Sequence, residues 1–221
     1  MSLGRLTAIQ QRVLETLADV EPRWTLTGGG ALAGFYTQHR DTRDLDLFFR
    51  DQRTLGMAVM DVRTRLEACG FSVAVLRSTP TFSQLDVRDA SGTVILDLVA
   101  DPTPVAEVPR SVTVGPVSIL IDTPYQLLVN KLCALLSRSE LRDLVDVRAL
   151  VASDADLMRA LTDCPGQDAG FSPLSFAWAL NGLPLERLAR ARGWPDDTIA
   201  ELASFRAHLI AIATAGARPA E

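Results

Sequence analysis

The fold is decided by residues 25–49, which read TLTGGGALAGFYTQHRDTRDLDLFF. The segment DLDLFF alternates polar and apolar residues with the period of a strand, so Asp44 and Asp46 project from the same face. Two neighbouring carboxylates repel each other unless a positive charge lies between them. The pattern therefore indicates a cation site close to a glycine-rich segment.

The three glycines, Gly28, Gly29 and Gly30, follow a short predicted strand over residues 23–27 and precede a segment of helical composition. Backbone N–H groups at a helix start, unobstructed by side chains, suit phosphate oxygens. Taken alone, a glycine run is also typical of a flexible loop, and D-x-D of a solvated strand edge. Both interpretations stay open for each motif by itself.

A third carboxylate, Asp97, lies in the apolar segment VILDLVA. An aspartate is costly to bury there unless it is paired or bound to a metal. If this strand lies beside DLDLFF, Asp44, Asp46 and Asp97 converge and can hold two metal ions for an in-line phosphoryl displacement. Magnesium suits such a site, because it commonly combines one or two carboxylates with substrate phosphates. Two Mg²⁺ ions close to a glycine segment suited to phosphate would indicate nucleotidyl transfer.

The rest of the chain predicts a mixed α/β part over residues 1–122 and a helical part over residues 123–221. Periodicity and turn residues predict the following elements in the first part: helices over 5–19 and 53–69, strands over 71–77, 82–89 and 93–101, and a hairpin over 114–121. A Thr-Pro helix start at residue 123 opens the second part. Its helices continue with interruptions near 163–170, 181–184 and 193–195.

Composition favours a globular protein of one large domain, or of one domain with a smaller one appended: 221 residues, 48% hydrophobic. No apolar run reaches the roughly 18 residues of a membrane span, and no charged-then-apolar leader opens the chain. The net charge of −5 argues against a general nucleic-acid coat. Cys69, Cys133 and Cys164 lack metal-type spacing and are expected to be buried thiols in a reducing compartment, which predicts a cytoplasmic location.

Lysine is almost absent from the sequence: 21 of the 22 basic residues are arginine, and the exception is Lys131. This count is informative only if Lys131 lies where the chemistry requires a point charge.

Residues 28–49 resemble the first motif of the AbiEii/AbiGii-type nucleotidyltransferases of the DNA polymerase β superfamily. That motif is a glycine pair, a small residue, an apolar helix, an arginine, a Ser or Thr, and D-x-D. The matching positions are Gly28, Gly29, Arg40, Thr42, Asp44 and Asp46. Residues 131–150 resemble the later motif of the family, a lysine, an arginine and R-D-x-x-D. The matching positions are Lys131, Arg138, Arg142, Asp143 and Asp146.

The resemblance implies an α+β fold, in which a polymerase-β-like mixed sheet flanked by helices is followed by a C-terminal helical region that completes the active site. It also implies magnesium-dependent transfer of an NMP from an NTP to a hydroxyl acceptor, with release of pyrophosphate. It places these residues at the nucleotide: Gly28, Gly29, Gly30, Arg40, Thr42, Lys131, Arg142 and Asp146. It assigns these to catalysis: Asp44, Asp46, Asp97, Lys131 and Asp143.

Within that implied site, Asp44 and Asp46 bind both metal ions, and Asp97 binds the ion that activates the acceptor and takes its proton. Lys131 neutralises phosphate charge. Asp143 and Asp146, at i and i+3 of one helical face, serve as an additional base or hold Lys131 or Arg142. The other interpretation of R-D-x-x-D is a pair of ordinary helix salt bridges.

One position departs from the motif, because Gly30 stands where the superfamily has a Ser or Thr whose hydroxyl contacts the NTP phosphates. This raises the alternative of a catalytically silent nucleotide-binding or interaction module. The acceptor also stays open: family members include toxins that modify tRNA, which implies a tRNA acceptor and a cognate antitoxin. A short acidic chain equally suits a small-molecule acceptor, as in antibiotic nucleotidyltransferases. We expect no membrane partner.

Overall fold

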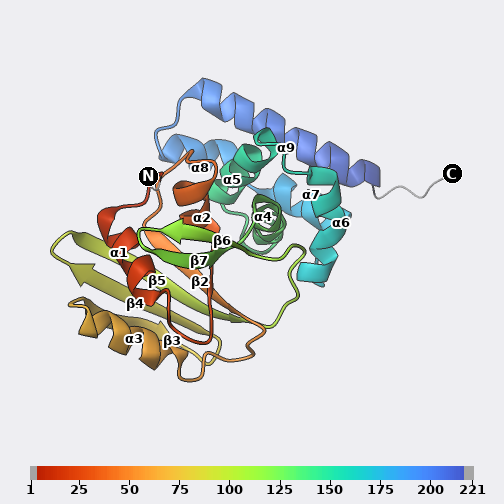
Figure 1. Ribbon diagram of the computed structural model, residues 1–221. Helices are drawn as coiled ribbons and strands as arrows, with labels where there is room; N and C mark the ends of the chain where they lie inside the picture. The colour runs from red at the N-terminus through yellow and green to blue at the C-terminus, as the bar shows by residue number, and fades with distance from the viewer. Residues whose placement is uncertain (1–3, 217–221) are drawn as a thin grey trace. The chain divides into compact units, whose positions relative to one another are not determined.

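The computed structural model describes residues 4–216, and the chain divides into two compact units, Met1–Thr123 and Pro124–Glu221 (Figure 1). Among the helices of the described residues, none combines the length and the apolar composition that a membrane span requires.

Within the described residues, the first unit holds one mixed sheet with the strand order β3-β4-β5-β2-β1-β7-β6. Its strands are β1 (Thr25–Thr27), β2 (Asp44–Arg50), β3 (Ser72–Ser78), β4 (Phe82–Asp89), β5 (Gly92–Asp101), β6 (Arg110–Val114) and β7 (Val117–Ile121). β2 runs parallel to β5 and antiparallel to β1, and β1 runs parallel to β7. The predicted α+β class with a mixed sheet is therefore confirmed. The hairpin predicted over residues 114–121 is longer than expected, because its first strand, β6, already begins at Arg110.

The two faces of the central strands differ in chemistry. On β2, Leu45, Leu47 and Phe49 are fully buried, whereas Asp44 and Asp46, which alternate with them, are only partly buried. β5 repeats this alternation of buried and partly exposed residues. Burial of the leucine face supplies the main stabilisation of this unit. The same period of two places the carboxylates on the opposite face.

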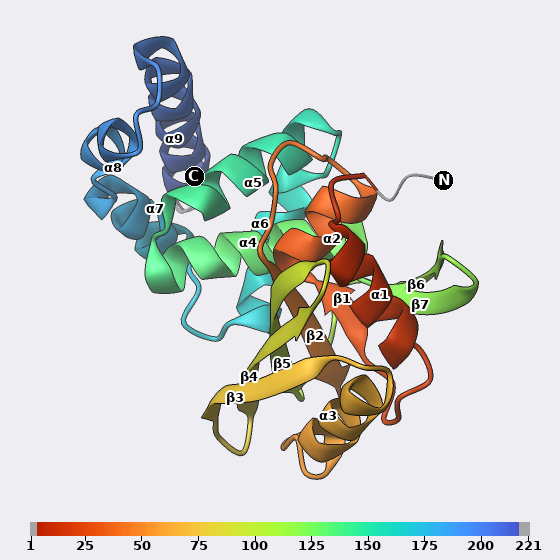
Figure 2. The same ribbon diagram turned by 90° about the vertical axis from the view of Figure 1, so that its left-hand side faces the viewer.

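Three helices belong to this unit: α1 (Ala8–Leu17), α2 (Gly28–Phe35) and α3 (Ala58–Ala68). α1 packs against β5 and α3 packs against β3 (Figure 2). These two helices also contact each other, and Arg65 of α3 donates to the Thr16 carbonyl of α1 at 3.1 Å. α1 begins with a capping box in which Thr7 and Gln10 satisfy each other's backbone N–H groups.

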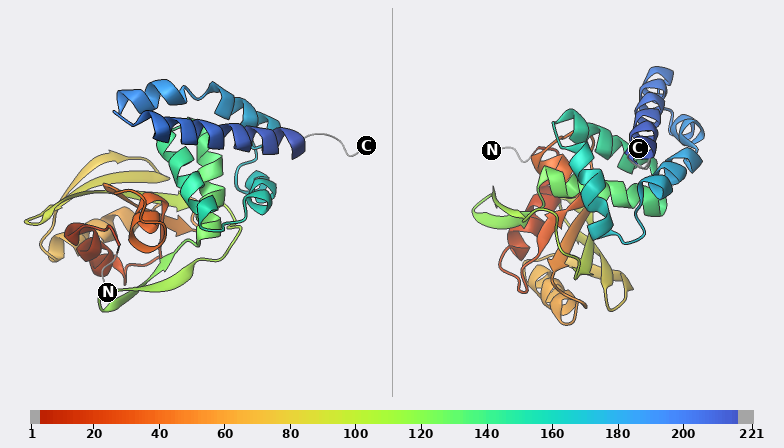
Figure 3. Two further views of the ribbon diagram at one scale, coloured as in Figure 1. Left: turned by 90° about the horizontal axis from the view of Figure 1, so that it is seen from above. Right: turned by 90° about the vertical axis from the view of Figure 1, so that its right-hand side faces the viewer.

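The second unit is helical over its described residues. Its helices are α4 (Pro124–Arg138), α5 (Leu141–Ala152), α6 (Leu157–Gln167), α7 (Pro173–Gly182), α8 (Leu185–Ala191) and α9 (Asp196–Gly216). α4 packs against α5, α6 and α7, and α9 lies alongside α7 and α8 (Figure 3). Proline at the first position of α7 follows the N-cap Ser172, whose hydroxyl accepts from the Ser175 N–H at 3.1 Å.

Three local predictions were wrong. The glycines do not form a turn before a helix but are the first turn of α2, because α2 is packed along its length and burial outweighs the poor helix propensity of glycine. The interruption predicted from residue 163 begins later, since α6 continues past Pro165 to Gln167. Of the three cysteines, only Cys164 is buried, and Cys69, which caps α3, is exposed.

Candidate active site

The central feature of the first unit is a row of polar residues across four neighbouring strands. The parallel register of β2 and β5 pairs Asp46 with Asp97. β1 pairs Thr27 with Asp46, and β4 pairs Gln84 with Asp97. Because neighbouring strands lie about 4.8 Å apart, the carboxylates of Asp46 and Asp97 project side by side from one face of the sheet. This confirms the prediction that the Asp97 strand lies beside DLDLFF.

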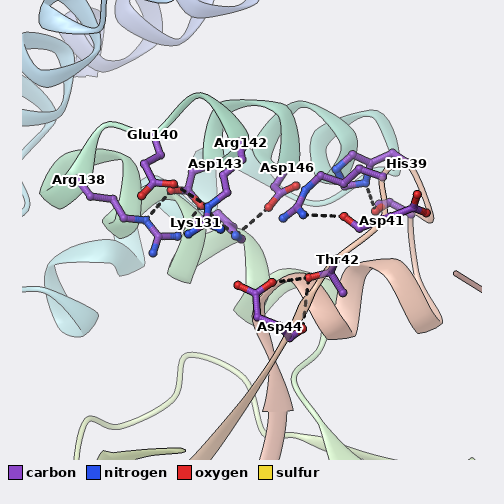
Figure 4. Close-up of polar contacts among 12 residues, drawn as sticks. His39, Asp41, Thr42, Asp44, Lys131, Arg138, Glu140, Arg142, Asp143 and Asp146 are labelled. Atoms are coloured by element: carbon purple, nitrogen blue, oxygen red, sulfur yellow. Dashed lines mark hydrogen bonds and ion pairs between the residues drawn. The ribbon is translucent and has the colours of Figure 1, made fainter. Parts of the chain in front are cut away.

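Asp44, two residues before Asp46 on β2, is held by Thr42. The Thr42 hydroxyl donates to Asp44 Oδ1 at 2.8 Å, as Figure 4 shows. Thr42 is itself buried, and its carbonyl accepts from the Gln10 side chain of α1 at 3.0 Å. The motif threonine therefore fixes the orientation of a carboxylate.

The start of α2 lies directly against these residues. Gly28 has a φ of +60°, and a Cβ atom on it would come within 2.1 Å of Asp46 Oδ2. A Cβ on Gly29 would meet Thr42 Oγ1 at 2.8 Å and Arg40 Nη2 at 3.3 Å. The N-terminal turn of α2 is thus bordered by Asp46, Thr42 and Arg40. The N–H groups in the first turn of a helix have no partner within the helix, and together with the helix dipole they suit phosphate oxygens.

Gly30 faces in a different direction. A Cβ on Gly30 would meet Leu45 Cδ2 at 2.9 Å and Leu26 Cδ1 at 3.2 Å, both in the core. A serine or threonine at this position would therefore direct its side chain toward leucines rather than toward a ligand at the N-terminus of α2. Gly30 gives no physical reason to expect weakened triphosphate binding.

In the second unit, Lys131 of α4 lies between two aspartates of α5 (Figure 4). Its Nζ is 2.9 Å from Asp143 Oδ1 and 2.8 Å from Asp146 Oδ2. Both carboxylates are fully buried, and the Lys131 side chain is only 7% exposed. The i and i+3 spacing does place both aspartates on one face of α5, as predicted. The single lysine of the chain is therefore the positive centre of a buried ion cluster.

Asp143 has a second cationic partner in Arg138, which donates to Asp143 Oδ2 from Nε at 2.7 Å and to Oδ1 from Nη2 at 2.8 Å. Burial by itself raises the pKa of Asp143, but the hydrogen bond from Arg138 and the charge of Lys131 outweigh it and hold the pKa below its ordinary value. Arg142, next in the motif, is 2.7 Å from Glu140 through its Nε.

The predicted convergence of three carboxylates is not formed. Within residues 4–216, no group of three or more His, Cys, Asp or Glu side chains could hold a metal ion. The donor chemistry of Asp46 and Asp97 nevertheless fits a magnesium ion, since this ion is commonly bound through one or two carboxylates while substrate phosphates and water complete its shell. Two carboxylates beside the N-terminal turn of α2 meet that requirement.

Gln84 was not predicted from the sequence. Its Nε2 donates to Asp97 Oδ1 at 2.9 Å across the β4–β5 ladder. The only signal in the sequence is that Gln84 interrupts a strand of mixed character, which is too weak to indicate a partner on another strand.

The geometry agrees with comparisons to known proteins. Residues 12–174 match the family model described as the nucleotidyl transferase AbiEii toxin of type IV toxin–antitoxin systems. This match covers most of the chain. The chain belongs to the AbiEii nucleotidyltransferase family. It is therefore a nucleotidyltransferase, as the two sequence motifs predict. Among curated proteins, no sequence matches this AbiEii family member.

Solved structures share the fold of this AbiEii family member. JHP933 from Helicobacter pylori is 18% identical, with a TM-score of 0.57 over 91% of this chain and 86% of that protein. A second nucleotidyltransferase structure from H. pylori is also 18% identical, with a TM-score of 0.56 over 94% of this chain and 93% of the other. The antibiotic-resistance factor ANT(2'')-Ia is 12% identical, with a TM-score of 0.50 over 74% and 94% of the two chains.

Proposed function

We propose that this nucleotidyltransferase moves an NMP from an NTP to a hydroxyl acceptor in a magnesium-dependent reaction, with Asp46 and Asp97 as the central metal-binding pair. The observation that supports the proposal is the register of β2 and β5, which pairs these aspartates beside the N-terminal turn of α2. Carboxylates suit the cation and a helix N-terminus suits the phosphates. Asp44, oriented by Thr42, lies two residues before Asp46 on the same face of β2.

In the proposed reaction, the acceptor oxygen forms a bond to the α-phosphorus, and the bond from that phosphorus to the bridging oxygen of the β-phosphate breaks. Pyrophosphate leaves, and Asp97 takes the proton of the acceptor hydroxyl. Bound Mg²⁺ supplies charge neutralisation at the phosphates and lowers the pKa of the acceptor hydroxyl. The backbone of Gly28 and Gly29, together with Arg40, holds the phosphate oxygens.

The helical unit contributes the later motif. Lys131 is buried and paired with Asp143 and Asp146, so we assign it the role of a fixed positive charge in the later motif, and we assign Arg142 and Asp146 to the nucleotide. Asp143 receives three donated bonds from Lys131 and Arg138 and is fully buried. These contacts support a positioning role for Asp143, in place of the catalytic role that the motif alone implied. The family match over residues 12–174 includes both sequence motifs.

The proposed protein partner is a cognate antitoxin, because the matching family is described as toxins of type IV toxin–antitoxin systems. The proposed acceptor is tRNA, as the resemblance to tRNA-modifying toxins implies. The cytoplasm is the proposed location, where both tRNA and NTPs occur.

Label transfer tests this function. The protein is incubated with Mg²⁺, each α-labelled NTP in turn and total cellular RNA, beside an Asp46→Asn variant and an Arg88→Met control. Arg88 is exposed and pairs with Asp86 on β4. We expect label in tRNA from the wild type and the control, and none from Asp46→Asn.

Other results would change the proposal. A ligand that binds the native state raises its melting temperature. If Mg²⁺ and NTP raise the melting temperature but no RNA is labelled, the proposed acceptor changes from tRNA to a small molecule. If no RNA is labelled and Mg²⁺ with NTP does not raise the melting temperature, the proposed catalysis is contradicted, and the interaction module is the remaining interpretation.

A further inference from the structure

We propose that Gln84 is a positioning residue for the metal site: its side-chain amide orients the Asp97 carboxylate for a divalent cation without neutralising it. The inference rests on the proposed function, because it concerns the affinity of the same site for its cation. Gln84 itself touches neither substrate nor cation in this scheme and acts through Asp97.

The contact is well defined. Gln84 Nε2 lies 2.9 Å from Asp97 Oδ1, and the two residues are direct partners in the antiparallel β4–β5 register. Ser83 and Leu85, on either side of Gln84, are fully buried, which fixes the strand at this point. An ionised carboxylate only accepts hydrogen bonds, so the NH₂ end of the amide must face Asp97.

The charge of the donor is the second observation. Three other aspartates on these strands are paired with arginine: Asp86 on β4 with Arg88, Asp89 on β4 with Arg12, and Asp101 on β5 with Arg50. At Asp97 the cross-strand partner is a neutral amide. An arginine at position 84 would place a positive charge on the carboxylate and compete with the cation, whereas an amide fixes the direction of the carboxylate and preserves its charge.

Orientation matters because the partner of Asp97 across β2 is Asp46. Because Gln84 holds Oδ1 toward β4, we assign the other oxygen of Asp97, Oδ2, to the cation that Asp97 shares with Asp46. Hydrogen-bonded residues behind metal-binding carboxylates typically contribute about 10–100-fold to metal affinity. We therefore expect loss of the Gln84 amide to weaken cation binding by a factor in that range.

Mn²⁺ binding, followed by the EPR signal of the free ion in the presence of a non-hydrolysable NTP, tests the inference directly. The variants are Gln84→Met, which keeps the length without a donor, and Gln84→Asn, which keeps the amide but shortens its reach by one methylene. Arg88→Met is the matched control, since it removes a donor to Asp86 on the same strand. We expect both Gln84 variants to raise the Kd for Mn²⁺ about 10–100-fold, with the Kd of Arg88→Met unchanged.

Each other outcome has its own meaning. If the wild type binds Mn²⁺ and both Gln84 variants bind it equally well, the inference is overturned while the proposed function stands. If the wild type binds no Mn²⁺, the metal-dependent function fails and the inference fails with it. Should Gln84→Met not fold, Gln84→Asn decides alone, because it preserves a polar residue on the partly exposed face of β4.

Discussion

Gly28 lies so close to Asp46 that a single added carbon would overlap the carboxylate, with a Cβ on Gly28 only 2.1 Å from Asp46 Oδ2. The absence of a side chain at the start of α2 therefore allows a carboxylate of β2 to lie against the helix N-terminus. The first motif of the sequence is, in physical terms, a contact between its first glycine and its last aspartate.

Gly28→Ala should displace Asp46 and reduce nucleotidyl transfer about 100-fold, because a shift of about 1 Å in a reacting group has effects of this size. Gly56→Ala is the matched control: Gly56 has a φ of +50° but no atom within 4 Å of its Cβ position. Both variants carry the backbone strain of a left-handed alanine, about 1–2 kcal/mol. Equal activity of the two variants would show that the contact with Asp46 is unimportant.

Gly30→Ser should lower stability by about 1–3 kcal/mol through overpacking against Leu45 and Leu26. Thermal unfolding measures this loss, and Gly182→Ser, whose Cβ position has no neighbour within 4 Å, is the control. The affinity for NTP, measured by calorimetry on the folded fraction, should not increase. Tighter NTP binding by Gly30→Ser would contradict the conclusion that a side chain at position 30 points toward Leu45 and Leu26.

Lys131→Met should reduce the free energy of unfolding by about 3–5 kcal/mol, because it leaves the buried carboxylates of Asp143 and Asp146 without their shared cation. Adding Asp146→Asn to Lys131→Met should recover part of that loss by removing one uncompensated charge. Urea denaturation of the four proteins in this double-mutant cycle gives the coupling energy. Additive effects of the two substitutions would exclude the buried ion cluster as a stabilising unit.

The stability contributed by Asp143 should disappear in acid. Its folded pKa lies below the ordinary value of 3.8, so its ionised form favours the native state at pH above that value. As the pH falls through the folded pKa, this contribution is lost. The difference in unfolding free energy between the wild type and Asp143→Asn should thus be constant near neutrality and shrink below about pH 4. A difference that is independent of pH down to about 3 would contradict the assignment.

Local periodicity was sufficient to predict much of the fold. The alternation in DLDLFF predicts β2 and the common face of Asp44 and Asp46, and the apolar run around Asp97 predicts β5. The alternation does so because the same period of two separates buried leucines from partly buried aspartates. The later motif likewise predicts that Lys131 belongs to the functional site. It does not predict that Lys131 is buried between Asp143 and Asp146.

The remainder depends on contacts between distant residues. The pairing of Asp46 with Asp97 is set by a register between strands that lie about fifty residues apart, and the contact of Gln84 with Asp97 is set by another. The glycines were predicted as a turn because propensity considers each residue by itself, whereas packing of Gly30 against Leu26 and Leu45 makes them helical. No local pattern contains that information.

The alternation along β2 also constrains how the length of the chain can vary. A single-residue deletion early in β2 would exchange the faces, placing aspartates in the core and leucines at the proposed cation site, so fold and chemistry would be lost together. A two-residue insertion between Asp46 and Phe49 would preserve the alternation and the pairing of Asp46 with Asp97, but would move Arg50 out of register with Asp101. Insertions and deletions compatible with activity must therefore fall in the connections, such as residues 51–57 and 102–109, which precede α3 and β6.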